Sequence, residues 1–368
     1  MTERQAQHDI LVKPNHDERA RQELCQAMRS HLLGDVQAGT ETIFESRVHP
    51  AFKKENGRAM KDRHEIRRAM TPDPFYRVFS ASLRSIQELM WDSVIDTVER
   101  EMPRLQTEFK KLHNQAKGTL TLDPDLDIPR YHAAADIHLQ PGGYHTDLAE
   151  DDLSAGAIFD RALYIYGNGK FGPYSDAMGH MVSGQVKALY TDFAPKRILD
   201  MGCTSGNSTL VYVDAFPEAE VHAIDIGAPC LRYAHARAET LNKTVHFAQA
   251  NAAETQYEDE SFDLIVSHIL FHETGRSALT NIMRECHRLL KPGGMMAHLD
   301  IPQDRHCEKM YESFLWDWEA YNNNETFAVV LRSLDYEEEA VTAGFVRDDV
   351  SIEDVAVGWP LLVGKKAA

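Results

Sequence analysis

The sequence lacks an apolar run long enough to cross a membrane, since a spanning helix needs about 20 consecutive apolar residues. Its five cysteines are scattered without paired spacing, which favours reduced thiols over a disulfide framework. The first residues are polar and of mixed charge, so no secretory signal is expected. We therefore expect a cytoplasmic protein with no membrane partner.

Excess basic charge is also missing from most of the chain. The 368 residues carry a formal net charge of −18, yet residues 1–114 hold 19 Lys and Arg against 18 Asp and Glu. The acidic excess therefore lies after residue 114, whereas an enzyme of nucleic acids needs basic surface around its site. The basic run at residues 53–68 is interpreted as a solvated helical face. A small-molecule substrate fits this balance better than a nucleic acid.

The first part of the chain has helical periodicity, over residues 16–115. Asp73 and Pro74 form an N-cap followed by proline at the first helical position. From Phe75 to Leu112 apolar residues recur every three or four positions, and Pro103 is expected to kink or split this helix. The long apolar stripe must be covered, either within its own domain or by a second copy in a homodimer, and the pattern favours neither.

The second part alternates strands with helix-length segments, which predicts a parallel sheet with helices on both faces. The expected strands are 197–201, 221–225, 245–249, 262–267, 294–300, 345–351 and 358–364. The fold class is therefore α/β, a doubly wound, mostly parallel seven-stranded sheet preceded by a mainly α-helical N-terminal domain. We expect a helical domain at 1–160 for substrate covering or oligomerisation, a lid loop and connecting helix at 161–195, and a catalytic domain at 196–368.

A glycine-rich turn, DMGCTSG at residues 200–206, connects the first expected catalytic strand to a helix. Glycines let the backbone approach a ligand there, and the helix N-terminus favours a negatively charged group. The next strand ends in Asp225, placed to accept hydrogen bonds from ribose hydroxyls. A nicotinamide site requires the spacing G-x-G-x-x-G. Here Thr204, two residues after Gly202, replaces the second glycine, and Thr209 stands three residues after Gly206, where the third would be.

The turn resembles the first motif, [DE]-x-G-x-G-x-G, of class I S-adenosylmethionine-dependent methyltransferases. FDLIVS at 262–267 is similar to the family's fourth strand, and ECHRLLKPGG at 285–294 to the helix and turn before its fifth. The last signature is typical of the small-molecule, ubiquinone-biosynthesis-like "type 11" group. The resemblance covers about residues 195–300.

This resemblance implies S-adenosylmethionine as cofactor and a set of contacts to it: Asp200, Gly202, Thr204, Gly206, Asp225, Ile226, Asn251, Ala252, Ser267 and His268. Asp200 would hold the turn and the cofactor's amino group, and Asn251 and Ala252 would flank adenine. Thr204 departs from the family's middle glycine and is not free to adopt a positive φ angle. Asn251 stands where the family often has an acidic residue.

Methyl transfer from a sulfonium is an in-line displacement that depends on alignment, with a base needed only if the acceptor must lose a proton. His268 and His272, four residues apart after the fourth motif strand, are the catalytic candidates. We assign His272 as the base and His268 as a contact on the cofactor side. Capping a helix or bonding a backbone carbonyl explains these histidines equally well.

The substrate is expected to lie against the N-terminal half, where His138, His145, Tyr166 and Tyr174 are the candidate contacts. Structural roles in an aromatic core compete with this interpretation. A metal is not expected, because the histidines and the aspartate of residues 132–145 have no recognised ligand spacing. The predicted function is methyl transfer to O, N or S of a small metabolite. The alternative is a regulatory protein that binds S-adenosylmethionine without catalysis.

Overall fold

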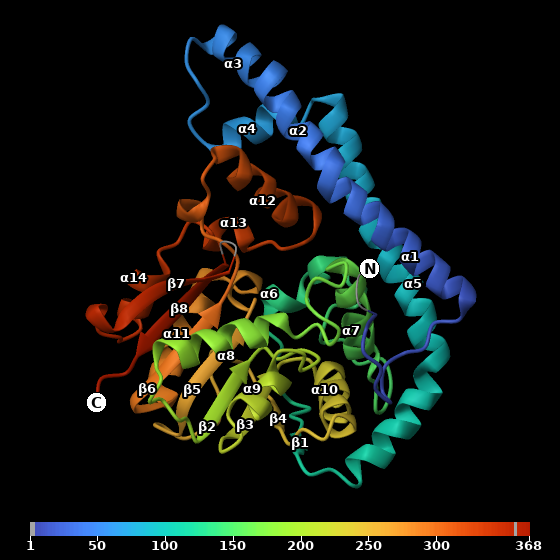
Figure 1. Ribbon diagram of the computed structural model, residues 1–368, viewed down its shortest axis with the longest axis vertical. Helices are drawn as coiled ribbons and strands as arrows, with labels where there is room; N and C mark the ends of the chain where they lie inside the picture. The colour runs from blue at the N-terminus through green and yellow to red at the C-terminus, as the bar shows by residue number, and fades with distance from the viewer. Residues whose placement is uncertain (1–3, 357–358) are drawn as a thin grey trace.

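The computed structural model describes residues 4–356 and 359–368. Its described residues form one sheet with the strand order β1-β4-β3-β2-β5-β6-β8-β7 (Figure 1). The strands are β1 (Thr119–Thr121), β2 (Arg197–Met201), β3 (Glu220–Asp225), β4 (His246–Gln249), β5 (Phe262–His268), β6 (Leu290–Leu299), β7 (Val350–Ala356) and β8 (Trp359–Lys365). Strands β1 to β6 pair in parallel, whereas β8 is antiparallel to both β6 and β7. The α/β class with a helical N-terminal region is confirmed.

The sheet has eight strands, so the expected number of seven is wrong. The additional strand is β1, which pairs in parallel with β4 at the edge of the sheet. Its three residues are exposed or half-buried and carry no apolar alternation of their own. This strand is therefore defined by its backbone pairing with β4, and its own sequence contains no signal that predicts it.

Helices cover both faces of the sheet. On one face α8 (Ala177–Leu189), α9 (Thr209–Ala215) and α10 (Ala228–Thr240) share an apolar core with the strands. On the other face α11 (Arg276–Leu289) and α14 (Tyr336–Thr342) do the same. The interior of β2 is entirely buried, as expected for a strand covered on both sides.

Strand β2 marks the point where the strand order reverses. The chain proceeds from β2 to β3 and β4 on one side, and β5 pairs with the other side of β2. In open parallel sheets the ligand crevice lies outside the carboxyl ends of the strands at such a switch point. The glycine turn after β2 therefore occupies the place where a cofactor is expected.

The N-terminal region is a long pair of antiparallel helical segments that rises along one side of the sheet domain (Figure 1). One segment contains α1 (His16–His31), α2 (Gln37–Ile43) and α3 (His49–Asn56), joined by π-helical turns. After α4 (Arg63–Met70), the helix α5 (Pro74–His113) returns without interruption at Pro103. The side chain of Asp73 caps α5 as expected, accepting a hydrogen bond from the amide of Phe75 at 2.9 Å.

The apolar stripe of α5 is buried within the chain. It packs against α1, α7 (Ser154–Tyr166) and α10, and the same core includes residues of α12 (Met310–Asn322). This packing accounts for the stripe, and a homodimer through these helices stays a prediction, as does the division into domains at residues 160 and 195. No helix among the described residues is both long and apolar enough to cross a membrane.

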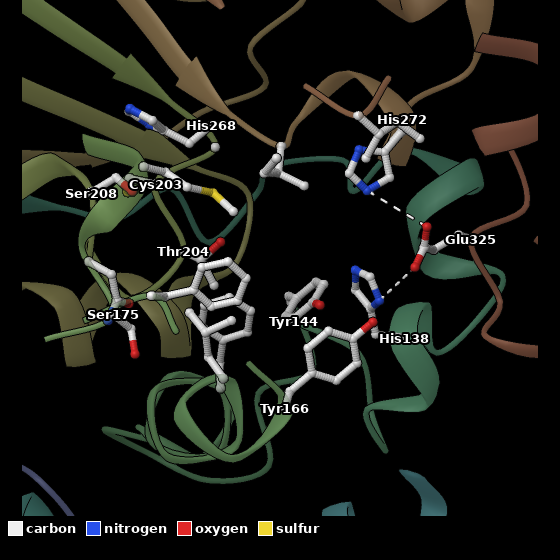
Figure 2. Close-up of a pocket in the computed structure, with 18 of the residues that line it drawn as sticks. His138, Tyr144, Tyr166, Ser175, Cys203, Thr204, Ser208, His268, His272 and Glu325 are labelled. Atoms are coloured by element: carbon white, nitrogen blue, oxygen red, sulfur yellow. Dashed lines mark ion pairs between the residues drawn. The ribbon is translucent and has the colours of Figure 1, made fainter. Parts of the chain in front are cut away.

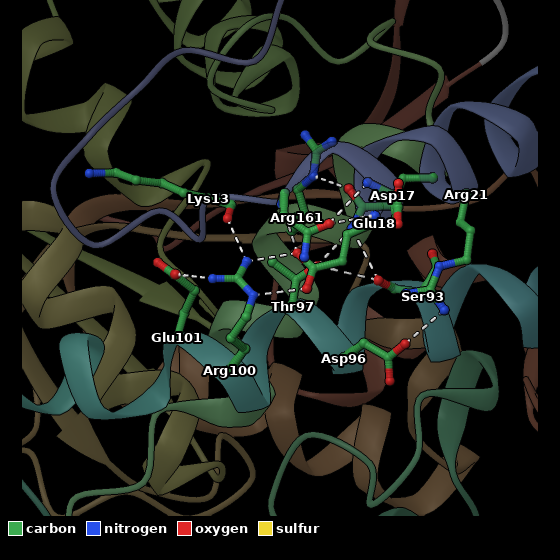
Figure 3. Close-up of polar contacts among 12 residues, drawn as sticks. Lys13, Asp17, Glu18, Arg21, Ser93, Asp96, Thr97, Arg100, Glu101 and Arg161 are labelled. Atoms are coloured by element: carbon green, nitrogen blue, oxygen red, sulfur yellow. Dashed lines mark hydrogen bonds and ion pairs between the residues drawn. The ribbon is translucent and has the colours of Figure 1, made fainter.

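A charged network ties α1 to α5 (Figure 3). Arg100 donates from Nε to Oε1 of Glu18 at 2.9 Å and from a terminal nitrogen to Oε2 at 2.7 Å. The Thr97 hydroxyl donates to the same carboxylate at 3.1 Å. The Arg100 hydrogen bonds lower the pKa of Glu18 to about 2, so this carboxylate is charged at neutral pH and fixes the register of the two helices.

The remaining helices are short or follow the last parallel strand. They are α6 (Arg130–Ala133) before α7 and α13 (Ala328–Leu331) between α12 and α14. Contacts join α12 to both α4 and α5. The segment between β6 and β7 therefore reaches over the carboxyl edge of the sheet toward the N-terminal helices (Figure 1).

Candidate active site

The glycine turn after β2 bends sharply at three residues. Gly202 and Gly206 have φ angles of +74° and +71°, and Thr204 has a φ of +47° despite its branched side chain. Left-handed backbone at a β-branched residue is strained, and such strain is concentrated at functional sites. The amide of Thr204 donates to Oδ2 of Asp225 at 2.9 Å, which helps to hold this conformation.

Replacing Thr204 with glycine is expected to raise the free energy of unfolding by about 1 kcal/mol, because the left-handed conformation costs a branched residue roughly 1–2 kcal/mol and glycine's extra chain entropy offsets part of this gain. Urea denaturation measures the difference. Asn242→Gly is the matched control, since Asn242 also has a positive φ, of +55°, but asparagine tolerates it. A loss of stability in Thr204→Gly would show that contacts of the threonine side chain outweigh the strain.

Asp200, at the carboxyl end of β2, is buried and faces the space above the turn. Its Oδ2 accepts a hydrogen bond from the hydroxyl of Thr209 at 2.5 Å. Its Oδ1 is buried without a hydrogen-bond partner, and Nδ1 of His268 lies 3.4 Å from it. The other ring nitrogen of His268 pairs with the hydroxyl of Tyr212 at 2.9 Å. An unpaired buried carboxylate oxygen fits an incoming ammonium group, such as the amino group of S-adenosylmethionine.

Asp225 ends β3 beside the same turn. Its carboxylate accepts hydrogen bonds from the amides of Thr204 and, at 2.8 Å, Gly227. Burial nevertheless raises the pKa of Asp225 above its usual value. A cavity of about 150 Å³ opens here, with walls that include Asp225, Ile226, Asn251 and Ala252. The residues expected to hold ribose and adenine thus share one cavity.

A larger cavity of about 320 Å³ lies on the other side of the turn. Residues shared by the walls of both cavities are His138, Tyr144, Phe159, Gly202, Thr204, His268 and Ile269. The walls of the larger cavity include aromatic side chains from three other parts of the chain, namely Trp91 on α5, Tyr166 on α7 and Trp316 on α12. Figure 2 shows Tyr166 beside His138. Side chains of the N-terminal half and of α12 therefore both lie over this edge of the sheet, and a substrate-covering role for the N-terminal half stays a prediction.

A buried cluster of histidines and carboxylates lies where the two cavities meet, with His138, His272 and Glu325 labelled in Figure 2. His138 lies between two carboxylates, with Nε2 2.8 Å from Oε1 of Glu273 and Nδ1 3.0 Å from Oε1 of Glu325. Nδ1 of His272 lies 2.8 Å from Oδ1 of Asp300, and its Nε2 lies 3.4 Å from Oε1 of Glu273. Segments that are far apart in the sequence thus converge on one point.

The two imidazoles are held as cations by this arrangement. Burial alone lowers the pKa of a histidine, but Glu325 and Glu273 outweigh it and raise the pKa of His138 to about 10. For His272 burial is again opposed, here by Asp300 and Glu273, which raise its pKa well above the usual value. Both ring nitrogens of His272 already face carboxylates. This geometry does not suit the role of base that the sequence assigns to His272.

Two of the four expected substrate contacts line the larger cavity, namely His138 and Tyr166. His145 and Tyr174 lie outside both cavities as the described residues define them. The ring of His145 lies 5.3 Å from that of His132, and the side chain of Tyr174 is 38% exposed. Although His145 is only seven positions from His138 in the sequence, and Tyr174 only eight from Tyr166, neither lines the cavity that its neighbour lines.

Two expected cofactor contacts also lie apart from the cavity walls. The Ser267 hydroxyl is buried and pairs with Nδ1 of His298 at 2.8 Å. A Cβ at Gly206 would lie at ordinary contact distance, 3.4 Å, from that of Ala234, so the φ of +71° accounts for this glycine and the space around it does not. Both residues support the turn and its strand, and the cavity walls are formed by their neighbours.

Sequence reasoning missed several residues of the site, both cavity-lining ones and Asp300, which lies behind His272. Asp300 directly follows β6, and Asp225 is the last residue of β3. The rule that polar residues at the carboxyl ends of parallel strands face the ligand, which selected Asp225, therefore also predicts Asp300. Glu319 on α12 and Glu325 after it lie in no recognised motif, and the same holds for Trp91 and Trp316. Only the packing of α5 and α12 over the sheet edge brings these side chains into the site.

Comparison with known proteins is consistent with this geometry. Residues 198–294 match the family model described as a methyltransferase domain. Demethylmenaquinone methyltransferase of Thermus thermophilus is 33% identical over 114 residues, covering 31% of this chain and 51% of that protein. Malonyl-(acyl-carrier protein) O-methyltransferase of Methylococcus capsulatus is 37% identical over 106 residues, covering 28% of this chain and 36% of that protein. The chain thus spans about half the length, or less, of these curated relatives.

Among solved structures, phosphoethanolamine N-methyltransferase 2 of Haemonchus contortus, in complex with S-adenosyl-L-methionine, aligns with a TM-score of 0.44. That alignment has 16% sequence identity and covers 57% of each chain. The family match at residues 198–294 includes the glycine turn, the carboxylate of Asp225 at the end of β3 and the strand β5, which ends at His268. Residues 198–294 therefore form a class I methyltransferase domain whose methyl donor is S-adenosylmethionine.

Proposed function

We propose that the chain transfers a methyl group from S-adenosylmethionine to an O, N or S atom of a small acceptor by in-line displacement. The observation that carries this proposal is the junction of two cavities at the glycine turn. One cavity has carboxylate and amide groups suited to a nucleoside, and the other is enclosed by aromatic walls. A donor in the first and an acceptor in the second would meet beside Gly202 and Thr204.

The cofactor side is assigned by its polar groups. Oδ1 of Asp200, on the wall of the larger cavity beside the turn, would bind the amino group. In the smaller cavity, Asp225 would bind ribose and Asn251 with its neighbours would flank adenine. His268, fixed by Tyr212, would close the site beside the sulfonium. When bound, S-adenosylmethionine supplies an electrophilic methyl group. The protein supplies alignment and excludes water.

The acceptor side is assigned by enclosure and size. Trp91, Tyr166 and Trp316 provide apolar and π surface that excludes water and favours positive charge. The relatives' names indicate acceptors that are a quinone precursor in one case and a carrier-bound malonyl group in the other. A cavity of about 320 Å³ is consistent with a small acceptor.

Glu319 is our candidate for the proton acceptor where the acceptor must lose a proton. Its carboxylate lines the larger cavity and accepts a hydrogen bond from Nδ2 of Asn323 at 2.7 Å. Burial, with the nearby charge of Glu325, raises the pKa of Glu319 to about 7. A carboxylate with a pKa near neutrality is suited to general base catalysis.

Turnover across a panel of amines, thiols, phenols and carboxylic acids tests the proposed function directly. Formation of S-adenosylhomocysteine with one acceptor class supports it. Tight binding of S-adenosylmethionine without turnover of any acceptor would instead favour the regulatory alternative. Neither outcome depends on knowing the natural substrate in advance.

Asp225→Asn is expected to weaken S-adenosylmethionine binding by about 10–100-fold, since a hydrogen bond to a charged group contributes roughly 1.5–3 kcal/mol. Asparagine keeps the size of the side chain and one acceptor oxygen for the turn amides. Calorimetric titration of the cofactor measures the change, with Asp214→Asn on exposed α9 surface as the control. An unchanged dissociation constant for Asp225→Asn would place the ribose elsewhere.

A further inference from the structure

We propose that His138, His272 and Glu273 bind a divalent transition-metal ion where the two cavities meet, since His138 lines both, His272 the larger and Glu273 the smaller. One ring nitrogen of each imidazole and a carboxylate oxygen of Glu273 lie within 4.8 Å of one another. Oε1 of Glu273 is 2.8 Å from Nε2 of His138 and 3.4 Å from Nε2 of His272. Two imidazoles and one carboxylate converging on a point are a recognised ligand set for such ions.

The second ring nitrogen of each histidine, Nδ1, contacts a carboxylate, and this supports the assignment. Nδ1 of His272 faces Oδ1 of Asp300 at 2.8 Å, and Nδ1 of His138 faces Oε1 of Glu325 at 3.0 Å. A carboxylate behind a histidine orients the ring and directs its other nitrogen toward a metal. Both histidines have this arrangement, and a bound ion would replace the proton that Nε2 of each imidazole directs at Glu273, with release of those protons to solvent.

The carboxylate ligand itself gives a second, independent observation. Oε2 of Glu273 is buried and has no hydrogen-bond partner. Buried polar atoms are nearly always paired, so an orphaned carboxylate oxygen beside two imidazoles indicates a missing cation. The second oxygen would allow Glu273 to bind through either or both of its oxygens.

The surrounding structure holds the ligands rigidly. The carbonyl of His138, a residue with a φ of +55°, accepts hydrogen bonds from Nε2 of Gln87 and Nε1 of Trp91, both at 2.8 Å. Asp300 accepts from the amide of Phe271 at 2.7 Å, next to His272. Helix α5 thus positions one histidine, and the end of β6 positions the other.

This site differs from the one that the sequence suggested and discounted. His138 was considered there with the histidines of residues 132–145, whose spacing fits no ligand pattern. In the structure its partners are His272 and Glu273, more than 130 positions later. The expectation of a metal-free protein considered the histidines near His138 in the chain, and the proposed site is made of different neighbours.

The donor set favours Mn²⁺, Fe²⁺, Co²⁺ or Zn²⁺, because imidazole nitrogen suits these ions better than Mg²⁺ or Ca²⁺. Resting on the proposed function, the ion would act as a Lewis acid that holds and polarises an acceptor oxygen or sulfur inside the larger cavity. The substrate class would then be acceptors with a metal-binding hydroxyl, thiol or carboxylate group. Metal binding itself can be measured without any acceptor.

The test uses the full chain, stripped of metal by a chelator and titrated with Co²⁺, Zn²⁺ and Mn²⁺ by calorimetry. We expect one ion per chain, with a visible ligand-field absorption spectrum for Co²⁺. His272→Gln and Glu273→Gln should each weaken binding by more than about 100-fold, and Asp300→Asn by about 10–100-fold. His246→Gln is the matched control, because His246, His222 and Glu220 form another cluster at the opposite end of the strands.

Circular dichroism and S-adenosylmethionine affinity show whether each variant is folded, and Asp300→Asn tests the site even where a ligand variant unfolds. Absence of stoichiometric binding of all three ions at millimolar concentration would overturn the proposal. Binding that survives His272→Gln but is lost in His246→Gln would overturn it as well. Because these measurements need neither acceptor nor turnover, their failure is distinct from failure of the proposed methyl transfer.

Discussion

Replacing Asp160 with alanine is expected to lower the free energy of unfolding by about 3–5 kcal/mol, because it removes one partner of a buried charge network. Asp160 lies on α7 and is fully enclosed. Its Oδ2 accepts a hydrogen bond from the hydroxyl of Tyr233 at 2.8 Å and lies 3.2 Å from Nε2 of His8. Its Oδ1 accepts from Nδ2 of Asn207 at 3.0 Å. One carboxylate thus joins the N-terminal segment, α7, α10 and the glycine turn.

The cost arises mainly from Arg237, which is buried 3.7 Å from Asp160. Without the carboxylate, its guanidinium keeps a hydrogen bond to the carbonyl of Tyr174 at 2.9 Å but loses its counter-charge. Burial disfavours the charged form of Asp160, yet Arg237 and His8 hold its pKa well below the usual range. The stabilisation is therefore present at neutral pH and is lost as the pH falls below the ordinary aspartate pKa of about 4.

Urea denaturation at neutral and acidic pH measures both effects. Asp214→Ala is the control, because Asp214 forms an exposed pair with Lys243, and an exposed pair contributes about 0–1 kcal/mol. The double variant Asp160→Ala with Arg237→Met should recover part of the loss, since no unpaired charge remains buried. A loss in Asp160→Ala no larger than that of the control would show that water or other groups satisfy Arg237.

Much of the sheet was predictable because its signals are local. Apolar runs followed by helix-length segments located β2 to β6 within a few residues, and the tail strands β7 and β8 were expected near their observed positions. Strand β1 was not, because it has three residues and depends on backbone pairing with β4. Local periodicity cannot show a pairing between segments that are more than 120 positions apart.

The candidate site divides in the same way. The glycine turn and Asp225 are contiguous with strand motifs, and their positions follow from the topology of a parallel sheet. His138, Glu319 and Glu325 reach the cavity only through the packing of α5 and α12, so no motif contains them. His145 and Tyr174 have the same side chains as His138 and Tyr166, which line the larger cavity, but they lie outside the walls of both cavities. Residue chemistry alone does not separate the two groups.

Glu319→Gln is expected to lower kcat by about 10²–10⁴-fold for an acceptor that must lose a proton, because it removes the group we assign as general base. Glu325, Arg29, His138 and Tyr166 are the titratable and charged groups that face Glu319. Burial and Glu325 raise its pKa to about 7, so the carboxylate is protonated below that pH and inactive as a base. The wild-type rate should therefore rise with pH through about 7.

The pH profile distinguishes a base from a residue that only supports the cavity. With saturating S-adenosylmethionine and an acceptor found in the panel, Glu319→Gln should lose the rise near pH 7, and Glu319→Asp should keep a rise at a reduced rate. Glu338→Gln, on the exposed surface of α14, is the control for the loss of one negative charge. If Glu319→Gln lowers the rate but leaves the profile unchanged, the carboxylate positions the acceptor and another group takes the proton. An acceptor that carries no exchangeable proton should show neither the rise nor the large effect, since its methylation needs no base.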